Sequence, residues 1–146
     1  MRTDLEEYLI EKERGFLATV GRNGEPTIVP VCFVYSDGMI YTAVDRKPKK
    51  KGRLARTQNI LLNEQVAFIA DTYVDDWRRL SYGLVHGKAD IVANLKESRM
   101  AKEMLVSKYP QYRWLGLRDS QIIRIKVQRA KLWRFSRTRL ESAVRT

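Results

Sequence analysis

Cysteine and histidine are nearly absent from this chain, and their scarcity limits the chemistry it can perform. The single Cys32 cannot form a disulfide within the chain, which fits a reducing compartment. It lies in an apolar stretch, where a small buried hydrophobe is its ordinary role. The one histidine, His86, has no cysteine near it and no nucleophile elbow, so neither a metal site nor a Ser-His-Asp hydrolase is indicated. If the protein is an enzyme, a cofactor therefore carries the chemistry.

Long apolar runs are missing as well. No segment is long and apolar enough to span a membrane. The first thirteen residues are charged throughout and lack an apolar signal core, so we expect a cytoplasmic protein. The length of 146 residues fits one domain, which we place at residues 1–136, followed by a basic C-terminal tail at 137–146.

The net charge of +11 is concentrated in two blocks. Residues 46–56 hold seven Lys and Arg and no acidic residue, a net of +7. Residues 111–146 hold ten Lys and Arg against two acids, a net of +8, which leaves −4 for the rest of the chain. This distribution favours local anion sites or basic faces over a uniformly basic coat.

The stretch from Thr27 to Lys51 leads into the first basic block. It predicts a strand over Thr27–Tyr35, a turn at residues 36–38 and a strand over Met39–Ala43, followed by a loop rich in cations. Lysine can hold a phosphate as a point charge and arginine as a bidentate fork. A phosphate site and a plain solvated surface are both compatible with the loop from its residue pattern alone.

The predicted strand Thr27–Tyr35 is apolar on both faces. One face carries Ile28, Pro30, Cys32 and Val34, and the alternate residues from Val29 to Tyr35 point the other way. We therefore expect a core on one side and a second cover on the other, namely a ligand, a partner subunit or both. Pro30 lacks a backbone donor, which indicates a sheet edge, a bulge or a place where pairing gives way to a ligand.

The remaining pattern predicts an α+β fold that is mainly antiparallel β. Six to seven strands and three flanking helices suggest a closed or nearly closed barrel. The expected strands lie at residues 16–20, 27–35, 39–43, 65–70, 82–92, 121–128 and 131–135, and the expected helices at 3–14, 53–63 and 94–109. Trp77, in the polar loop 71–80, is either a stacking platform or a plug for the barrel end, and its pattern favours the plug.

Several segments in order resemble one known family. They are FLATV-GRNGEP-TIVPVCFVY-SDG-MIYTAVDRKPKK, RTQNILLNEQVAFIADTY and VHGKADIV. Together they resemble the flavin-binding split β-barrel superfamily of pyridoxamine 5′-phosphate oxidase. Residues 41–49 and the spacing of Asp71, Tyr73, Asp76, Trp77 and Leu80 resemble its branch of deazaflavin (coenzyme F420)-dependent oxidoreductases. The resemblance covers roughly residues 8 to 135.

The resemblance implies a homodimer with two cofactor sites at the subunit interface. The cofactor ring would lie along the backbone of Val29, Pro30, Val31 and Cys32. Tyr41 and Thr42 would lie near its polar chain, and Trp77 near the site, from one subunit or the other. Its phosphate would be held by Lys47 and Lys49, with help from Lys50 or Arg53.

The resulting hypothesis is an oxidoreductase that transfers hydride between a phosphorylated deazaflavin and a small organic substrate. Coenzyme F420 is favoured because its long anionic tail would suit the extra lysines, and FMN is the alternative. A cofactor-binding protein without turnover would need the same pocket, so the sequence does not separate it from an enzyme. A nucleic-acid-binding barrel is disfavoured, since Arg124 and Lys126 are explained as the exposed face of a strand.

Overall fold

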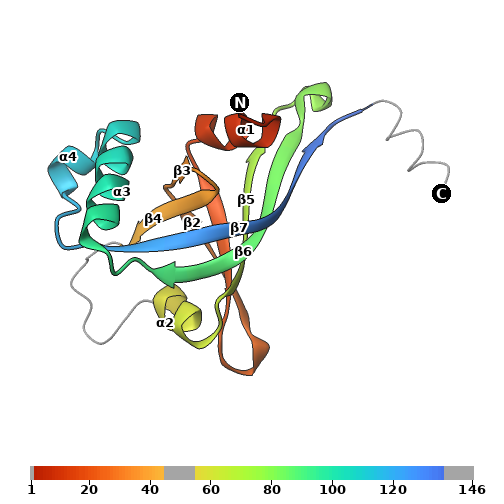
Figure 1. Ribbon diagram of the computed structural model, residues 1–146. Helices are drawn as coiled ribbons and strands as arrows, with labels where there is room; N and C mark the ends of the chain where they lie inside the picture. The colour runs from red at the N-terminus through yellow and green to blue at the C-terminus, as the bar shows by residue number, and fades with distance from the viewer. Residues whose placement is uncertain (1, 45–54, 137–146) are drawn as a thin grey trace.

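The computed structural model describes residues 2–44 and 55–136, and Figure 1 shows their arrangement. The strands are β1 (Gly15–Val20), β2 (Pro26–Val31), β3 (Val34–Ser36), β4 (Met39–Val44), β5 (Gln65–Thr72), β6 (Ser81–Ile91) and β7 (Gln121–Arg134). The helices are α1 (Asp4–Glu11), α2 (Ala55–Leu62), α3 (Leu95–Lys108) and α4 (Tyr112–Leu115), with 3-10 turns at Arg22–Gly24 and Trp77–Arg79. None of these helices is long and apolar enough to cross a bilayer.

All seven strands form one antiparallel sheet in the order β2-β1-β5-β6-β7-β4-β3. Its two edge strands, β2 and β3, are consecutive in the chain and separated only by Cys32 and Phe33. The sheet must therefore curl until its edges approach each other, which gives the half-barrel in Figure 1. The predicted α+β class and strand-rich barrel are confirmed.

The predicted strand Thr27–Tyr35 is in fact two strands. The segment pairs with β1 as far as Val31, and after Phe33 it pairs with β4 at the opposite sheet edge. Because the change of partner occurs within two residues, the apolar pattern runs through it unbroken. Pro30 does lie in an edge strand, as its missing N–H indicates.

Two predicted strands at the C-terminal end are one. Residues 121–134 form the single strand β7, because the long strand β6 pairs with it from Ser81 to Ile91. Strand β6 carries a bulge between His86 and Gly87. A Cβ at Gly87 would stand 2.3 Å from the carbonyl oxygen of Lys126, so glycine allows this close approach. The short helix α4 lies between α3 and β7.

Two apolar clusters lie on opposite sides of the sheet. The larger fills the inside of the curl, where Leu9 of α1 and Ile60 of α2 pack with Phe33 and Phe68. The smaller lies outside, where Ala101 and Leu105 of α3 pack over β3, β4 and the start of β7. We call this outer side the covered face; its sheet residues are Val34, Tyr41, Ala43 and Ile122.

Candidate functional site

The junction at Cys32 is fixed from three directions. The hydroxyl of Thr42 donates to the carbonyl oxygen of Cys32 at 2.7 Å. The hydroxyl of Tyr109, at the end of α3, accepts from the N–H of Phe33 at 3.0 Å and donates to the carbonyl oxygen of Glu13 at 2.7 Å. The place where the chain changes sheet edge is thus held to β4, to α3 and to the segment after α1.

Two grooves flank this junction, and both are lined by Cys32 and Tyr109. One has a volume of about 620 Å³ and is otherwise lined by Glu11, Lys12, Glu13, Arg14 and Asp71. The other, of about 320 Å³, is otherwise lined by Gln111, Tyr112 and Leu115. Burial raises the pKa of Tyr109 to about 12, so its hydroxyl stays protonated near neutral pH and can donate a hydrogen bond.

Tyr41 and Thr42 are buried, and their hydroxyls are used within the chain. Thr42 contacts the Cys32 carbonyl, as above, while Tyr41 donates to Glu97 of α3 at 2.6 Å. Arg124 of β7 completes this network, with N–O distances of 2.6 Å to both Glu97 and Asp90. A contact between either hydroxyl and a cofactor stays a prediction.

The hydrogen bonds of this network shift the pKa values of Glu97 and Tyr41 in opposite directions. The hydrogen bond from Tyr41, helped by Arg124, keeps the pKa of Glu97 below its usual range. Burial, and then the bond to Glu97, raise the pKa of Tyr41. These groups join α3 to β4, the strand that leads into the first basic block.

The other outward part of the sheet is apolar and uncovered. Two rows of cross-strand neighbours run over β2, β1, β5 and β6, and we call them the open face: Pro30, Phe16, Ile69, Leu84 and Ile28, Ala18, Ala67, His86. Ile28 is 66% exposed and Pro30 is exposed, while the other six are half-buried. Helices α1 and α2 pack on the inner side, so no described helix covers this face.

The residues predicted to bind the cofactor ring lie on different faces of the sheet. Val29 and Val31 point into the inner core, while Pro30 lies on the open face and Cys32 is partly exposed at the junction. This agrees with the predicted alternation of the strand. No described element covers Ile28 and Pro30 on the open face.

The interpretation of Trp77 as a barrel plug is wrong. Its side chain is 58% exposed in the turn between β5 and β6, because Asp76 caps that turn and directs it away from the core. Figure 1 shows this turn at the end of the molecule opposite α2. A contact between Trp77 and a cofactor stays a prediction.

The predicted phosphate-binding residues Lys47, Lys49, Lys50 and Arg53 lie outside the described residues. The segment that follows them offers one relevant observation. Thr57, in the first turn of α2, has a buried hydroxyl with no hydrogen-bond partner among the described residues. A buried unsatisfied hydroxyl at a helix start next to a cation-rich segment is compatible with an anionic group bound there.

Sequence reasoning missed the residues that α3 contributes. Tyr109 and Glu97 are polar residues on a helix whose sequence pattern indicated only a covering role. Their partners lie 76 and 56 positions away in the chain, so no local pattern could have paired them. Nor do the described residues contain a cluster of histidine, cysteine and carboxylate side chains suited to a metal.

The chain matches the family model of pyridoxamine 5′-phosphate oxidase over residues 1–134. It belongs to that family. Comparison with curated proteins finds no match. The family assignment agrees with the half-barrel and confirms the superfamily that the sequence resembles.

Solved structures share the fold at low identity. A conserved hypothetical protein from Mycobacterium tuberculosis aligns with a TM-score of 0.73 and 18% identity, covering 92% of this chain and 86% of that one. An FAD-binding protein from Mesorhizobium loti gives 0.69 and 20%, covering 92% and 96%. The heme storage protein HutZ from Vibrio cholerae gives 0.71 and 15%, covering 92% and 95%. At these identities the likeness concerns the fold alone.

Proposed function

We propose that this protein is an oxidoreductase that binds a phosphorylated deazaflavin, coenzyme F420, between two copies of the chain. FMN is the alternative cofactor. The observation that carries the proposal is the family match over residues 1–134. The bound cofactor would supply hydride transfer to or from a small organic substrate.

The open face supports the homodimer. Apolar side chains from four strands lie exposed or half-exposed on it, and burying them between two copies would remove that area from water. A twofold contact is self-complementary, so one apolar face suffices for both partners. The cofactor would supply part of the second cover that Ile28 and Pro30 lack in one chain.

The chain's own groups have separable roles in this proposal. The backbone of residues 29–32 would line the ring, and the junction bonds from Thr42 and Tyr109 would hold that backbone in place. Lys47 and Lys49, with Lys50 or Arg53, would hold the phosphate, and the unsatisfied hydroxyl of Thr57 fits the same role. Trp77 would reach the site from the other subunit.

The extra lysines support F420 over FMN. Residues 46–56 carry seven cations and no acid, more positive charge than one phosphate needs, and F420 has a longer anionic tail. The titration that tests the cofactor uses purified protein with F420 and with FMN, followed by tryptophan fluorescence. Lys47→Ala/Lys49→Ala should weaken binding of the preferred cofactor by about tenfold or more, since each lost charged contact costs about 1.5–3 kcal/mol.

A matched control removes two lysines elsewhere. Lys96→Ala/Lys126→Ala changes two exposed residues on α3 and β7 and lowers the net charge equally. It should leave cofactor affinity unchanged at physiological salt. Preference for FMN would move the protein to the flavin branch, and binding of neither cofactor would refute the proposal.

The family fold also serves for binding without turnover, because one neighbour is a heme storage protein. Steady-state oxidation of the reduced cofactor with a panel of enones and quinones separates the two possibilities. Turnover with any member supports the enzyme. Tight binding of the cofactor with no turnover would leave a carrier function.

A further inference from the structure

We propose that a groove between α1 and α3 binds an amphipathic monocarboxylate, with Lys108 pairing with the carboxylate. This site is separate from the open face and goes beyond the proposed cofactor function. The groove has a volume of about 470 Å³, within the range of small-molecule pockets. Its lining residues are Ile10 of α1, Val34 and Tyr35 of β3, and Met100, Glu103, Met104, Ser107 and Lys108 of α3.

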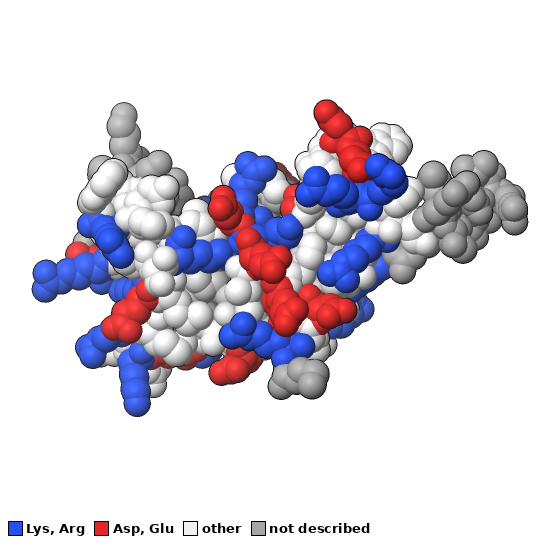
Figure 2. Space-filling model, turned by 90° about the horizontal axis from the view of Figure 1, so that it is seen from above, with Lys and Arg blue, Asp and Glu red and all other residues white. Residues whose placement is uncertain are grey.

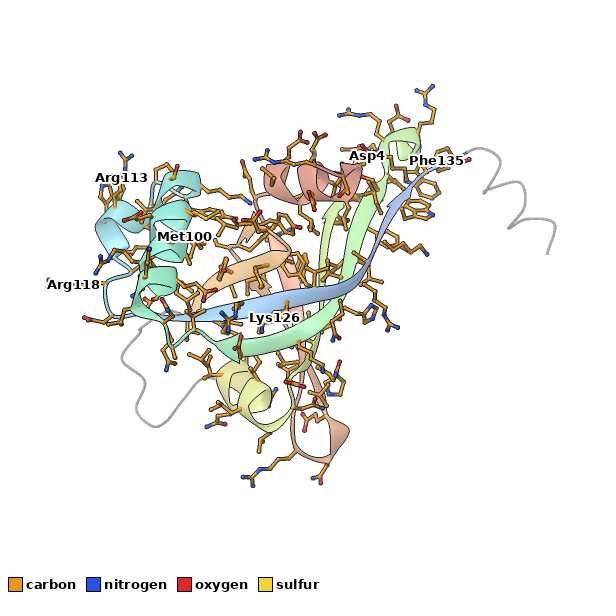
Figure 3. All side chains as sticks on the ribbon, viewed as in Figure 1. Asp4, Met100, Arg113, Arg118, Lys126 and Phe135 are labelled. Carbon is orange, nitrogen blue, oxygen red and sulfur yellow. The ribbon has the colours of Figure 1, made fainter. Side chains whose placement is uncertain are left out.

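The walls of the groove are mainly apolar. Ile10, Val34, Met100 and Met104 contribute hydrocarbon and thioether surface, and methionine adapts readily to ligands of different shape. Figure 2 looks down on this region and shows uncharged surface between the acidic side chains at the centre and the charged group at the left. Figure 3 shows Met100 on the side of α3 that faces α1 and β3. An alkyl chain or an apolar ring fits such walls.

Among the described residues that line this groove, Lys108 is the only cation. Its Nζ is buried and has no hydrogen-bond partner among the described residues, although a lysine can donate three hydrogen bonds. The Nζ lies 4.0 Å from the ring centroid of Phe33 and 5.4 Å from that of Tyr109. Since Nζ is buried, it would reach a ligand in the groove by rotation about the bonds of its aliphatic stem.

No ion pair with a carboxylate of the described residues compensates the lost hydration of this ammonium. Burial lowers the pKa of Lys108 to about 8 and outweighs the opposite effect of the nearby Cys32 and Glu13. A buried ammonium without an anion is costly, whereas an anion seated beside it recovers much of that cost. A ligand carboxylate therefore gains more from this site than a neutral group of the same size.

The surroundings select against other ligands. A purely apolar ligand would leave the ammonium unpaired, and an organic cation would be repelled by it. A polyanion is disfavoured because Glu103 lies on the groove wall and the first turn of α1 carries Asp4, Glu6 and Glu7. One carboxylate on an apolar body satisfies all these conditions.

Isothermal titration calorimetry with three probes of equal chain length tests the site: octanoate, octan-1-ol and octylamine, at a pH below 8. Octanoate should bind at least about tenfold more tightly than octanol, since a charged hydrogen bond is worth roughly 1.5–3 kcal/mol. Octylamine should bind most weakly. Equal affinity for octanoate and octanol, or binding of neither at millimolar concentration, would refute the proposal.

Two variants locate the effect. Lys108→Met keeps the length of the side chain and should reduce octanoate affinity to that of octanol, whereas Lys96→Met, an exposed residue on the same helix, should leave it unchanged. Met100→Trp at the partly exposed rim should weaken octanoate and octanol alike by filling the groove. An octanoate preference that survives in a folded Lys108→Met variant, or a Met100→Trp variant that binds both probes normally, would contradict the assignment. No flavin is needed, so the result does not depend on the proposed cofactor.

Discussion

The covered face and the open face are two parts of the outward side of one sheet, and the chain treats them differently. On the covered face, Ala101 and Leu105 of α3 are fully buried over β3 and β4. On the open face, Ile28 is 66% exposed although it lies only six residues before Val34, which is buried under α3. Two equally apolar stretches of the sheet therefore differ in burial: α3 covers the first, and no described element covers the second.

The covered face and the open face also differ in how their polar groups are bonded. Beneath α3, Tyr41, Glu97, Arg124 and Asp90 bond to one another, so the covered face is internally satisfied. On the open face, His86 and its cross-strand neighbour Arg129 form no comparable network with other described residues. A surface that is apolar and lacks its own polar network is what a contact with a second copy requires.

Truncation of a buried residue on the covered face should have the largest effect on the folded chain. Leu105→Ala removes methyl groups from a fully buried side chain and should lower the free energy of unfolding by about 2–5 kcal/mol. Ile28→Ala on the open face should change the stability of the isolated protomer by less than about 1 kcal/mol. Urea denaturation at several protein concentrations measures both, and similar losses at low concentration would remove the distinction between the faces.

A charged residue on the open face should weaken association of the proposed homodimer. Ile28→Asp would place an unpaired carboxylate in the proposed interface and weaken association by about 2 kcal/mol or more. Sedimentation velocity should show a dimer for the unmodified protein and a monomer for the variant at micromolar concentration. Leu95→Asp, which changes an exposed residue on α3, is the control and should stay dimeric.

Breaking the network on the covered face should cost more unfolding free energy than breaking an exposed ion pair. Arg124→Ala leaves two carboxylates without their partner and should cost about 1–3 kcal/mol, whereas Glu64→Gln breaks an exposed 3.4 Å pair with Lys88 and should cost less than about 1 kcal/mol. Urea denaturation near pH 7 compares the two losses. Equal losses would mean that the network is as weak as a surface pair.

The stability that Glu97 contributes to the fold should be lost at acid pH. Its pKa is lowered in the folded protein, so the stability it adds is present above its unfolded pKa and is lost as pH falls through the folded pKa. The difference in unfolding free energy between the unmodified protein and Glu97→Gln should therefore shrink toward acid pH. Urea denaturation in parallel pH series measures it, and a difference that does not change with pH would contradict this role.

Lys108 should give the smallest effect, and its pH dependence should fall in the alkaline range. Its folded pKa of about 8 lies below the ordinary 10.5, so the charged form destabilises the fold, and the unmodified protein gains stability as pH rises between these values. Lys108→Met should be at least as stable as the unmodified protein at pH 7, and its advantage should decline above pH 8. Thermal denaturation of both proteins from pH 7 to 10 checks the sign, and an advantage that grows above pH 8 would contradict it.

The sequence predicted the elements better than their pairing. The helix expected at residues 3–14 and the turn at 36–38 follow from local chemistry; the structure has α1 capped by Thr3 and Glu6, and a turn with a positive φ at Gly38. The change of sheet edge at Cys32 was missed, because apolar alternation does not reveal which strand is the partner. The exposure of Trp77 depends on the capped turn around it rather than on its own residue type.

In the candidate site, too, local features follow from the sequence, whereas contacts between distant residues do not. The alternation of Val29, Pro30 and Val31 follows from the period of a strand, and the structure confirms it. The bonds from Tyr109 to Phe33 and from Tyr41 to Glu97 join residues far apart in the chain, so only the fold reveals them. Contact of these residues with a cofactor stays a prediction.

Native mass spectrometry of the purified protein, with F420 and separately with FMN, tests the central claim most directly. We expect a dimer that carries two cofactor molecules, with F420 preferred over FMN, and an Ile28→Asp variant that loses both the dimer and the bound cofactor. A monomer that binds neither molecule, or a cofactor that stays bound to the monomeric Ile28→Asp variant with unchanged affinity, would contradict a site shared between the open faces of two copies.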